Sequence, residues 1–248
     1  MKFSSVSLDE VFRAVTRQIE AREPGYIVTP NVDHVCEYQI NEAFRRAYQN
    51  AFLVLADGVP VIWASRLCGS PIKEKISGSD LVYLLSEYAA LKGYSIFFLG
   101  AEPGVAARAA EILRQRFPGF TIAGAYSPPF GFEKDPEEER KTVAMIRDAA
   151  PDICYVALGS PKGDVWNYRQ CENTGVPVHV GVGASLDFVV GKVRRAPRWM
   201  QRTGLEWTWR LALEPRRLAT RYLVKDLRFL PLLLREFVRC FGKGRANA

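Results

Sequence analysis

One aspartate, Asp57, stands where a carboxylate can take part in catalysis. It follows the apolar run "FLVLA" and precedes Gly58. Such a run is typical of a buried strand, so the carboxylate is expected at the carboxyl end of the strand, where partial burial suits a general base. The alternative is that Asp57 caps the helix that follows. His34 and His179 are further candidates for proton transfer, although a single histidine is more often structural or solvated.

Glycine, serine and lysine residues gather at the ends of other predicted strands. Gly100 opens the turn "GAEPG", and Gly183 lies in "GVGASLDF". Both turns resemble loops that hold phosphate at a helix N-terminus, but neither has the G-x-G-x-x-G spacing, and such turns also serve only to change direction. Ser160 and Lys162 lie in "GSPK", where the lysine is a candidate phosphate ligand and equally a solvated residue at a helix start. We expect these four residues to bind substrate.

Short β-rich runs alternate with amphipathic helical patterns along most of the chain. This alternation predicts an α/β fold with a mainly parallel sheet, whose strands end at one edge and there form the ligand site. The clearest helix start is Asp135 as N-cap, followed by Pro136. The predicted strands are 25–31, 51–58, 94–101, 120–127, 153–160 and 177–183, and the clearest predicted helices are 8–22, 105–117 and 136–150.

Basic residues are concentrated near the C-terminus. The segment 194–245 holds twelve arginines and two lysines against four acidic residues, a net charge of +10, whereas the rest of the chain carries −3. The preference for arginine favours planar, bidentate contacts with phosphate or carboxylate. We therefore predict an α/β core over 1–191 and a basic helical appendage over 192–248.

A helical wheel at about 100° per residue divides this appendage into a basic and an apolar side. An amphipathic helix of this kind suits an anionic lipid surface. Pro231 is expected to kink or interrupt the helix. The basic side holds Arg217, Arg221, Lys225, Arg228, Arg235 and Arg239, and the apolar side holds Leu218, Tyr222, Leu230, Leu234, Phe237 and Phe241.

Composition excludes several classes of protein. With 48% hydrophobic and 25% charged residues in 248, the chain is globular and has no apolar run of the roughly 18–20 residues that span a membrane. The start, "MKFSSVSLDEVFRAV", has no apolar core, so we expect no signal peptide. An odd number of scattered cysteines indicates a reduced, cytoplasmic setting. They are Cys36, Cys68, Cys154, Cys171 and Cys240.

Motifs for metal or nucleophile chemistry are missing from the sequence. It has no D-x-D, no His/Cys cluster, no Walker loop and no G-x-S-x-G. If a diphosphate leaving group is stabilised here, arginines have to take the place of a metal ion.

Several stretches, in the same order, resemble motifs of the WecG/TagA/CpsF bacterial glycosyltransferases over roughly residues 5–225. They include "IVTPN", "LADGVPVIWASRL", "KISGSDLVYLL", "FFLGAEPGVAARAAEIL" and "VALGSPKGDVW". The most specific are "GVGASLDFVVGKVRRAPRWM" and "GLEWTWRLALEPRRLATRY", which combine RAP-x-W, GLEW and EP-x-R.

The resemblance implies a cytoplasmic enzyme, peripheral on the inner face of the bacterial membrane, that helps to assemble surface polysaccharide. Such enzymes transfer a sugar, in several cases N-acetylmannosamine, from a uridine diphosphate (UDP) sugar to a lipid-diphosphate-linked sugar. They invert the anomeric centre and use neither a metal nor a cofactor. The resemblance also implies a Rossmann-like α/β fold, an appendage that closes the site at an anionic membrane, and a homo-oligomer that competes with membrane binding.

Roles for individual residues follow from the same resemblance. Asp57 falls on the catalytic base, and Thr29 and Asn31 fall on residues that orient substrate. The family usually has P-K-Q-E where this chain has "PKGD", so Gly163 replaces a glutamine and Asp164 a glutamate; either another residue substitutes or substrate choice has changed. The arginines implied to stabilise the diphosphate are Arg195, Arg210, Arg217 and Arg221.

Two other readings of the sequence remain open. One is a basic-helix protein that binds membranes or nucleic acid without catalysis. The aromatic residues lie opposite the basic side, which suits lipid better than nucleic acid, so no nucleic-acid partner is expected. The other is a nucleotide-dependent oxidoreductase, which is disfavoured because the dinucleotide fingerprint is missing.

Overall fold

The computed structural model describes the backbone of residues 1–220 and 226–246, and their side chains except at 202, 217, 220 and 240–246. Six parallel strands form one sheet in the order β2-β1-β6-β5-β3-β4. All six predicted strands are therefore confirmed, each shorter than its apolar run. They are β1 (Tyr26–Val28), β2 (Leu53–Val54), β3 (Ser95–Gly100), β4 (Thr121–Tyr126), β5 (Ile153–Ala157) and β6 (Val178–Gly181).

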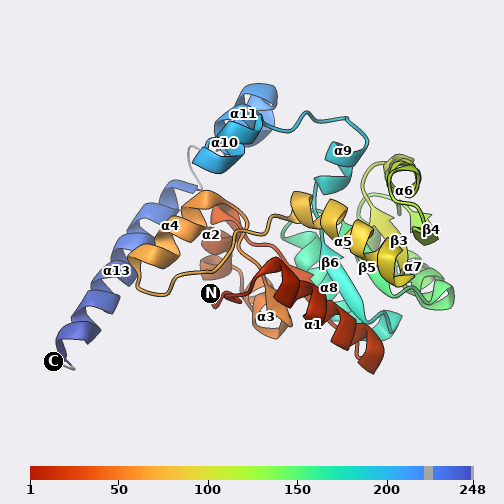
Figure 1. Ribbon diagram of the computed structural model, residues 1–248, viewed down its shortest axis with the longest axis horizontal. Helices are drawn as coiled ribbons and strands as arrows, with labels where there is room; N and C mark the ends of the chain where they lie inside the picture. Colours follow the sequence, from red (N-terminus) through yellow and green to blue (C-terminus); the bar gives the residue numbers. More distant parts are fainter. Residues whose placement is uncertain (221–225, 247–248) are drawn as a thin grey trace.

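Helices connect the strands and cover both faces of the sheet (Figure 1). The core helices are α1 (Leu8–Ala21), α2 (Val32–Ile40), α3 (Glu42–Asn50), α4 (Val59–Leu67), α5 (Gly78–Lys92), α6 (Val105–Arg116), α7 (Pro136–Ala149), α8 (Lys162–Thr174) and α9 (Ser185–Val189), with a 3₁₀ turn η1 (Phe132–Lys134). Helices α1, α6 and α7 confirm the three predicted from periodicity. The carboxylate of Asp135 accepts from the backbone N–H groups of Glu137 and Glu138, so it caps α7 as predicted.

Side chains of β3 alternate between two hydrophobic cores. Ile96 and Phe98 of β3 pack with α1, α5, α6 and α9, whereas Phe97 and Leu99 pack with α7 and α8. Every residue of β5 is buried. This double cover accounts for the nearly continuous apolar runs in the sequence and confirms the Rossmann-like α/β fold with a parallel sheet.

The C-terminal helices lie outside these layers (Figure 1). They are α10 (Arg198–Thr203), α11 (Glu206–Leu213), α12 (Pro215–Thr220), the 3₁₀ turn η3 (Asp226–Arg228) and α13 (Phe229–Ala246). Both η3 and α13 contact α2 of the core. The helical appendage is thus present, while its predicted boundary at residue 191 stays a prediction.

The appendage packs closely against the core at Gly204. This residue has φ +77°, and a Cβ built on it comes within 3.0 Å of the Cβ of Val59. Val59 is the first residue of α4 and follows Asp57 by two positions. The absence of a side chain at residue 204 therefore lets the appendage pack directly beside the predicted catalytic residue.

The predicted helical pattern is interrupted just before Pro231, as expected. Helix α13 begins at Phe229, so Pro231 lies in its first turn, where its missing N–H costs no helical hydrogen bond. The predicted basic side is carried by separate elements, because α12 ends at Thr220 and η3 begins at Asp226. Arg221, Tyr222 and Lys225 lie outside the described residues.

The long helix α13 keeps an exposed apolar side. Leu230, Leu234 and Val238 are each at least 60% exposed. Within the described ranges, however, no helix combines the length and apolarity needed to cross a membrane.

Gly100 packs against the backbone of the neighbouring strand. It has φ +96°, and a Cβ built on it lies 2.7 Å from the carbonyl oxygen of Ala157 on β5. Its carbonyl oxygen also accepts a hydrogen bond of 2.9 Å from the Ser127 hydroxyl. The glycine is therefore required by the close approach of β3 and β5.

We predict that Gly100→Ala lowers the free energy of unfolding by about 3 kcal/mol, from the left-handed backbone and the clash together. Gly131→Ala is the matched control, because Gly131 also has positive φ (+86°) but has nothing within 4 Å of its Cβ position. That variant is expected to lose ~1 kcal/mol. Chemical denaturation measures both, and equal losses would contradict a packing role for Gly100.

Candidate active site

A cleft of about 650 Å³ lies at the carboxyl ends of β2, β1, β6 and β5. Four neighbouring strands thus end in one cavity, as expected for a parallel sheet. The appendage forms the opposite wall. The core contributes Thr29, Asn31, Asp57, Lys75, Gly78, Ser160, Asp164 and Gly183, among others, and the appendage contributes Gln201, Glu206, Trp207, Arg210, Asp226, Leu227 and Leu230.

Asp57 is held at the cleft by backbone bonds that continue beyond β2. Its N–H donates to the carbonyl oxygen of Pro30 over 3.0 Å. Its carboxylate accepts from the backbone N–H of Gly78, the first residue of α5. Helix α4 starts after Gly58 without any side-chain cap, so Asp57 does not cap the helix that follows it.

The surroundings of Asp57 make its carboxylate more basic. Burial, followed by the negative charges of Glu206 and Asp80, raises its pKa to about 6, although Lys75 and the Gly78 N–H act in the opposite direction. A carboxylate with this pKa is ionised at neutral pH and is a stronger base than an exposed aspartate. Asp57 therefore has the position and the basicity of a general base.

Thr29 and Asn31 also line the cleft, after β1. The Thr29 hydroxyl reaches the carbonyl oxygen of Gly181 only at 3.5 Å, the outer limit of a hydrogen bond. It lies beside the start of α5, since a Cβ built on Gly78 comes within 2.9 Å of Oγ1. Asn31 is the N-cap of α2, and its Oδ1 accepts from the N–H of Asp33 over 3.1 Å. The side-chain oxygen of Asn31 therefore has a structural role as a helix cap, whereas the Thr29 hydroxyl is placed to orient a ligand.

The predicted arginines separate into different positions. Arg195 pairs with Asp80 in the first turn of α5 at 2.6 Å, and its Nε lies 4.0 Å from Glu206. It thereby ties the appendage to the core next to the cleft without lining it. Arg210 does line the cleft. Its guanidinium lies 5.6 Å from the centre of the Phe188 ring, and its buried Nε has no hydrogen-bond partner in the described part of the chain.

Arg217 and Arg221 cannot be placed in the cleft. The Arg217 side chain and the whole of Arg221 lie outside the described residues. Their roles stay predictions from the family resemblance.

Of the four remaining residues predicted to bind substrate, two line the cleft. Ser160 and Gly183 line the cleft. Gly100 and Lys162 do not. The Lys162 ammonium lies 3.7 Å from the Glu133 carboxylate and 4.8 Å from the centre of the Phe130 ring, so the lysine is engaged beside the 3₁₀ turn η1.

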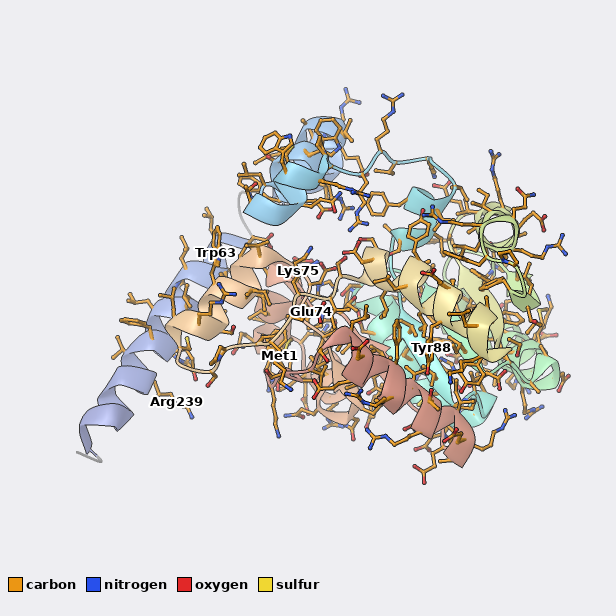
Figure 2. The ribbon with its side chains drawn as sticks, viewed as in Figure 1. Met1, Trp63, Glu74, Lys75, Tyr88 and Arg239 are labelled. Carbon is orange, nitrogen blue, oxygen red and sulfur yellow. The ribbon has the colours of Figure 1, made fainter. Side chains whose placement is uncertain are left out.

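Five charged residues of the cleft were not predicted from the sequence as functional: Asp33, Lys75, Asp164, Glu206 and Asp226. Lys75 lies in the connection between α4 and α5, a segment that does not directly follow a strand in the sequence (Figure 2). Glu206 lies in the "GLEW" motif, which marked the family without suggesting a role. Asp164 was noted only as a departure from the family pattern. The motif positions of Glu206 and Asp164 were available signals, whereas nothing in the sequence singled out Lys75.

Of the two histidines proposed for proton transfer, His34 lines the cleft and His179 does not. His179 is fully buried, and its ring nitrogens contact Thr174 Oγ1 at 2.8 Å and Asn167 Oδ1 at 3.1 Å. Burial lowers its pKa to about 3, so it stays neutral and structural. His34 lies in the first turn of α2 with Nδ1 2.7 Å from Asn31 Oδ1.

Comparison with known proteins gives the family of this chain. The family model described as "Glycosyl transferase WecG/TagA/CpsF family" matches residues 1–241. The chain belongs to this family. It is therefore a glycosyltransferase, and the open alternatives of a non-catalytic binding protein and an oxidoreductase are not supported.

Two relatives carry a more specific name. The chain is 34% identical over 202 residues to an N-acetylglucosaminyldiphosphoundecaprenol N-acetyl-beta-D-mannosaminyltransferase of Bacillus spizizenii (strain ATCC 23059 / NRRL B-14472 / W23), a match that covers 82% of this chain and 76% of the relative. It is 36% identical over 164 residues to a protein of the same name from Bacillus subtilis (strain 168), covering 65% and 61%.

Among the residues that the structure describes, no three His, Cys, Asp or Glu side chains are grouped so that they could hold a metal ion. Within the same part of the chain, the cations that line the cleft are Lys75 and Arg210.

We predict that kcat/KM falls about tenfold per pH unit below pH 6, because Asp57 with its pKa of about 6 must be ionised to accept a proton. Glu206→Gln should move this acid limb to lower pH, since the Glu206 charge raises the pKa. Lys75→Met should move it to higher pH. The exposed Glu172→Gln on α8 serves as control and should leave the limb unchanged.

The pH dependence of kcat/KM for the four proteins checks this assignment. Neither Glu206 nor Lys75 contributes to the pKa of Asp164, so opposite shifts identify Asp57 as the titrating group. Shifts in the same direction, or none, would contradict Asp57 as the base.

Proposed function

We propose that this enzyme transfers an N-acetylhexosamine, such as N-acetylmannosamine, from a UDP-sugar to a sugar linked to polyprenyl diphosphate. The observation that carries the proposal is the partly desolvated Asp57 carboxylate, facing a cleft whose other wall bears Arg210. The names of both Bacillus relatives describe a mannosaminyltransferase and an undecaprenol-diphosphate-linked N-acetylglucosamine. Such a reaction serves the assembly of a surface or extracellular polysaccharide.

Asp57 acts as the general base of the transfer. Its carboxylate takes the proton from the acceptor hydroxyl as the oxygen forms a bond to the anomeric carbon of the donor. The bond from that carbon to the β-phosphate oxygen breaks, and UDP leaves with the electron pair. Because the oxygen attacks opposite the leaving group, the anomeric configuration inverts. Thr29, beside Asp57 and Gly78, orients the reacting groups.

Arg210 and Lys75 stabilise the negative charge that develops on the departing diphosphate. Both line the cleft, and Nε of Arg210 is buried and available for a further hydrogen bond. A cation in a water-poor site is worth more than one in solution. We therefore propose that the reaction needs no metal ion and no cofactor other than the donor substrate.

The appendage places the cleft at a membrane surface. Trp199, Trp207, Leu230 and Leu234 are each at least 41% exposed. Arg198, Arg216 and Arg235 are exposed on α10, α12 and α13. Aromatic and aliphatic side chains mixed with arginines suit anionic headgroups. We propose that the enzyme is peripheral on the inner face of the cytoplasmic membrane, where a lipid-linked acceptor resides; formation of a homo-oligomer stays a prediction.

The first test is turnover with a panel of UDP-sugars and a polyprenyl-diphosphate-linked N-acetylglucosamine acceptor. We expect release of UDP and extension of the acceptor, unchanged by EDTA. Asp57→Asn should lower kcat at least 100-fold, because general-base catalysis contributes about 10²–10⁴. Unchanged thermal unfolding of the variant serves as the control for folding. Turnover by Asp57→Asn at the wild-type rate, or activity that EDTA abolishes, would refute this mechanism.

A second test distinguishes stabilisation of the leaving group by Arg210 from a general effect of positive charge on the enzyme. Arg210→Met should lower kcat about 100–1000-fold, the typical cost of removing one electrostatic stabiliser. Arg216→Met removes the same charge from α12, where Arg216 is exposed and lies outside the cleft wall, and it should keep kcat within about twofold. Steady-state kinetics with soluble acceptor analogues measures both. Equal losses in the two variants would argue against a specific role for Arg210.

A further inference from the structure

A second buried carboxylate, Asp164, lies at the other end of the cleft. It is in the first turn of α8, is only 8% exposed and lines the cleft. Its Oδ1 accepts a hydrogen bond of 3.0 Å from the hydroxyl of Tyr48, and the Ser160 side chain also bonds to it. Tyr48 is itself buried. Two donors from different elements therefore fix the orientation of this carboxylate.

Asp164 is too far from Asp57 to act on the same atom. Asp57 follows β2, whereas a Cβ built on Gly181 of β6, two strands further across the sheet, lies 3.9 Å from Asp164 Oδ1. At about 4.8 Å per strand, this separates the two carboxylates by roughly 10 Å. Two carboxylates that act at one glycosidic bond lie about 5–9.5 Å apart. Asp164 therefore contacts a different part of the substrate.

The wall beside Asp164 is almost free of side chains. At Gly159 and Gly183, an added Cβ meets nothing within 4 Å, so open space lies there. A Cβ built on Gly181 lies 3.9 Å from Asp164 Oδ1 and 3.6 Å from Asn167 Nδ2, a fully buried donor with no hydrogen-bond partner in the described part of the chain. Four glycines line this end of the cleft: Gly159, Gly163, Gly181 and Gly183.

We call this glycine-lined end of the cleft the recess. The charges around it decide which part of a sugar nucleotide it can bind. A carboxylate repels phosphate, but it accepts hydrogen bonds from hydroxyl or N–H groups. Lys75 and Arg210, which attract phosphate, are supplied by the α4–α5 connection and the appendage. The recess is formed by β5, β6 and α8, all from the core. A donor whose anomeric carbon lies at Asp57 thus extends its nucleoside toward Asp164.

We propose that Asp164 and the glycine-lined recess bind the nucleoside of the donor, with the carboxylate accepting hydrogen bonds from its hydroxyl or N–H groups. Tyr48 is a positioning residue, because its hydroxyl holds Asp164 Oδ1 in place. The recess of glycines gives the nucleoside room to approach the backbone. This assignment rests on the proposed function, which supplies the UDP-sugar.

The test is calorimetric titration of the full chain with UDP and, separately, with inorganic diphosphate. Asp164→Asn should weaken UDP binding about tenfold or more, the cost of losing a charged hydrogen-bond acceptor, and leave diphosphate binding unchanged. Tyr48→Phe should weaken UDP binding in the same direction by less. Asp148→Asn, an exposed aspartate on α7, is the matched control and should bind UDP like the wild type.

Two further measurements distinguish a role of Asp164 and the recess in binding from a folding defect. The KM for the UDP-sugar should rise in Asp164→Asn while kcat and the KM for the acceptor stay within a few fold. Gly181→Ala fills the recess with only ordinary contacts of 3.6–3.9 Å, so it should weaken UDP binding without lowering the unfolding temperature.

The outcomes separate this inference from the proposed function. Unchanged UDP affinity in Asp164→Asn, with normal turnover by the wild type, overturns the nucleoside assignment alone. An effect on diphosphate binding equal to that on UDP, or a rise in the KM of the acceptor instead of the donor, also overturns it. A wild-type protein that binds no UDP and transfers no sugar overturns both.

Discussion

The Asp57 carboxylate has to remain ionised in surroundings that disfavour its charge, and the structure around the cleft depends on this balance. Burial and the neighbouring Glu206 raise the pKa, whereas Lys75 and the N-terminus of α5 limit the rise to about 6. Glu206 belongs to the appendage, and Gly204 packs that appendage against Val59. The basicity of the core aspartate is thus set partly by the C-terminal helices.

The parallel sheet brings the reacting groups together without any local motif. Four adjacent strands end in the cleft, so residues far apart in the sequence, such as Thr29, Asp57, Asp164 and Gly183, share one wall. The appendage adds Arg210 opposite, and the Arg195–Asp80 ion pair of 2.6 Å joins the two parts beside α5. In the proposed mechanism, the core positions the substrate and the appendage adds charged groups to the cleft near its exposed apolar surface.

The sequence predicted the sheet and its helices because apolar runs and amphipathic periods depend on local spacing. It also predicted Asp57, Thr29, Asn31, Ser160, Gly183 and Arg210 as residues that meet in one cleft. It could not reveal that Gly100 is required by the backbone of β5, that Lys162 pairs with Glu133, or that Lys75 reaches the cleft, since each depends on tertiary contacts. The interruption predicted from Pro231 falls at the start of α13, at Phe229, a position that the helical wheel alone does not give.

The central claim is that Asp57 deprotonates an acceptor hydroxyl for direct attack on the donor, in a single displacement. The most direct measurement is the anomeric configuration of the transferred sugar, determined by NMR of the product formed from an α-linked UDP-sugar. Direct displacement predicts a β-linked product as the initial species. An α-linked product would show retention of configuration and contradict the role assigned to Asp57.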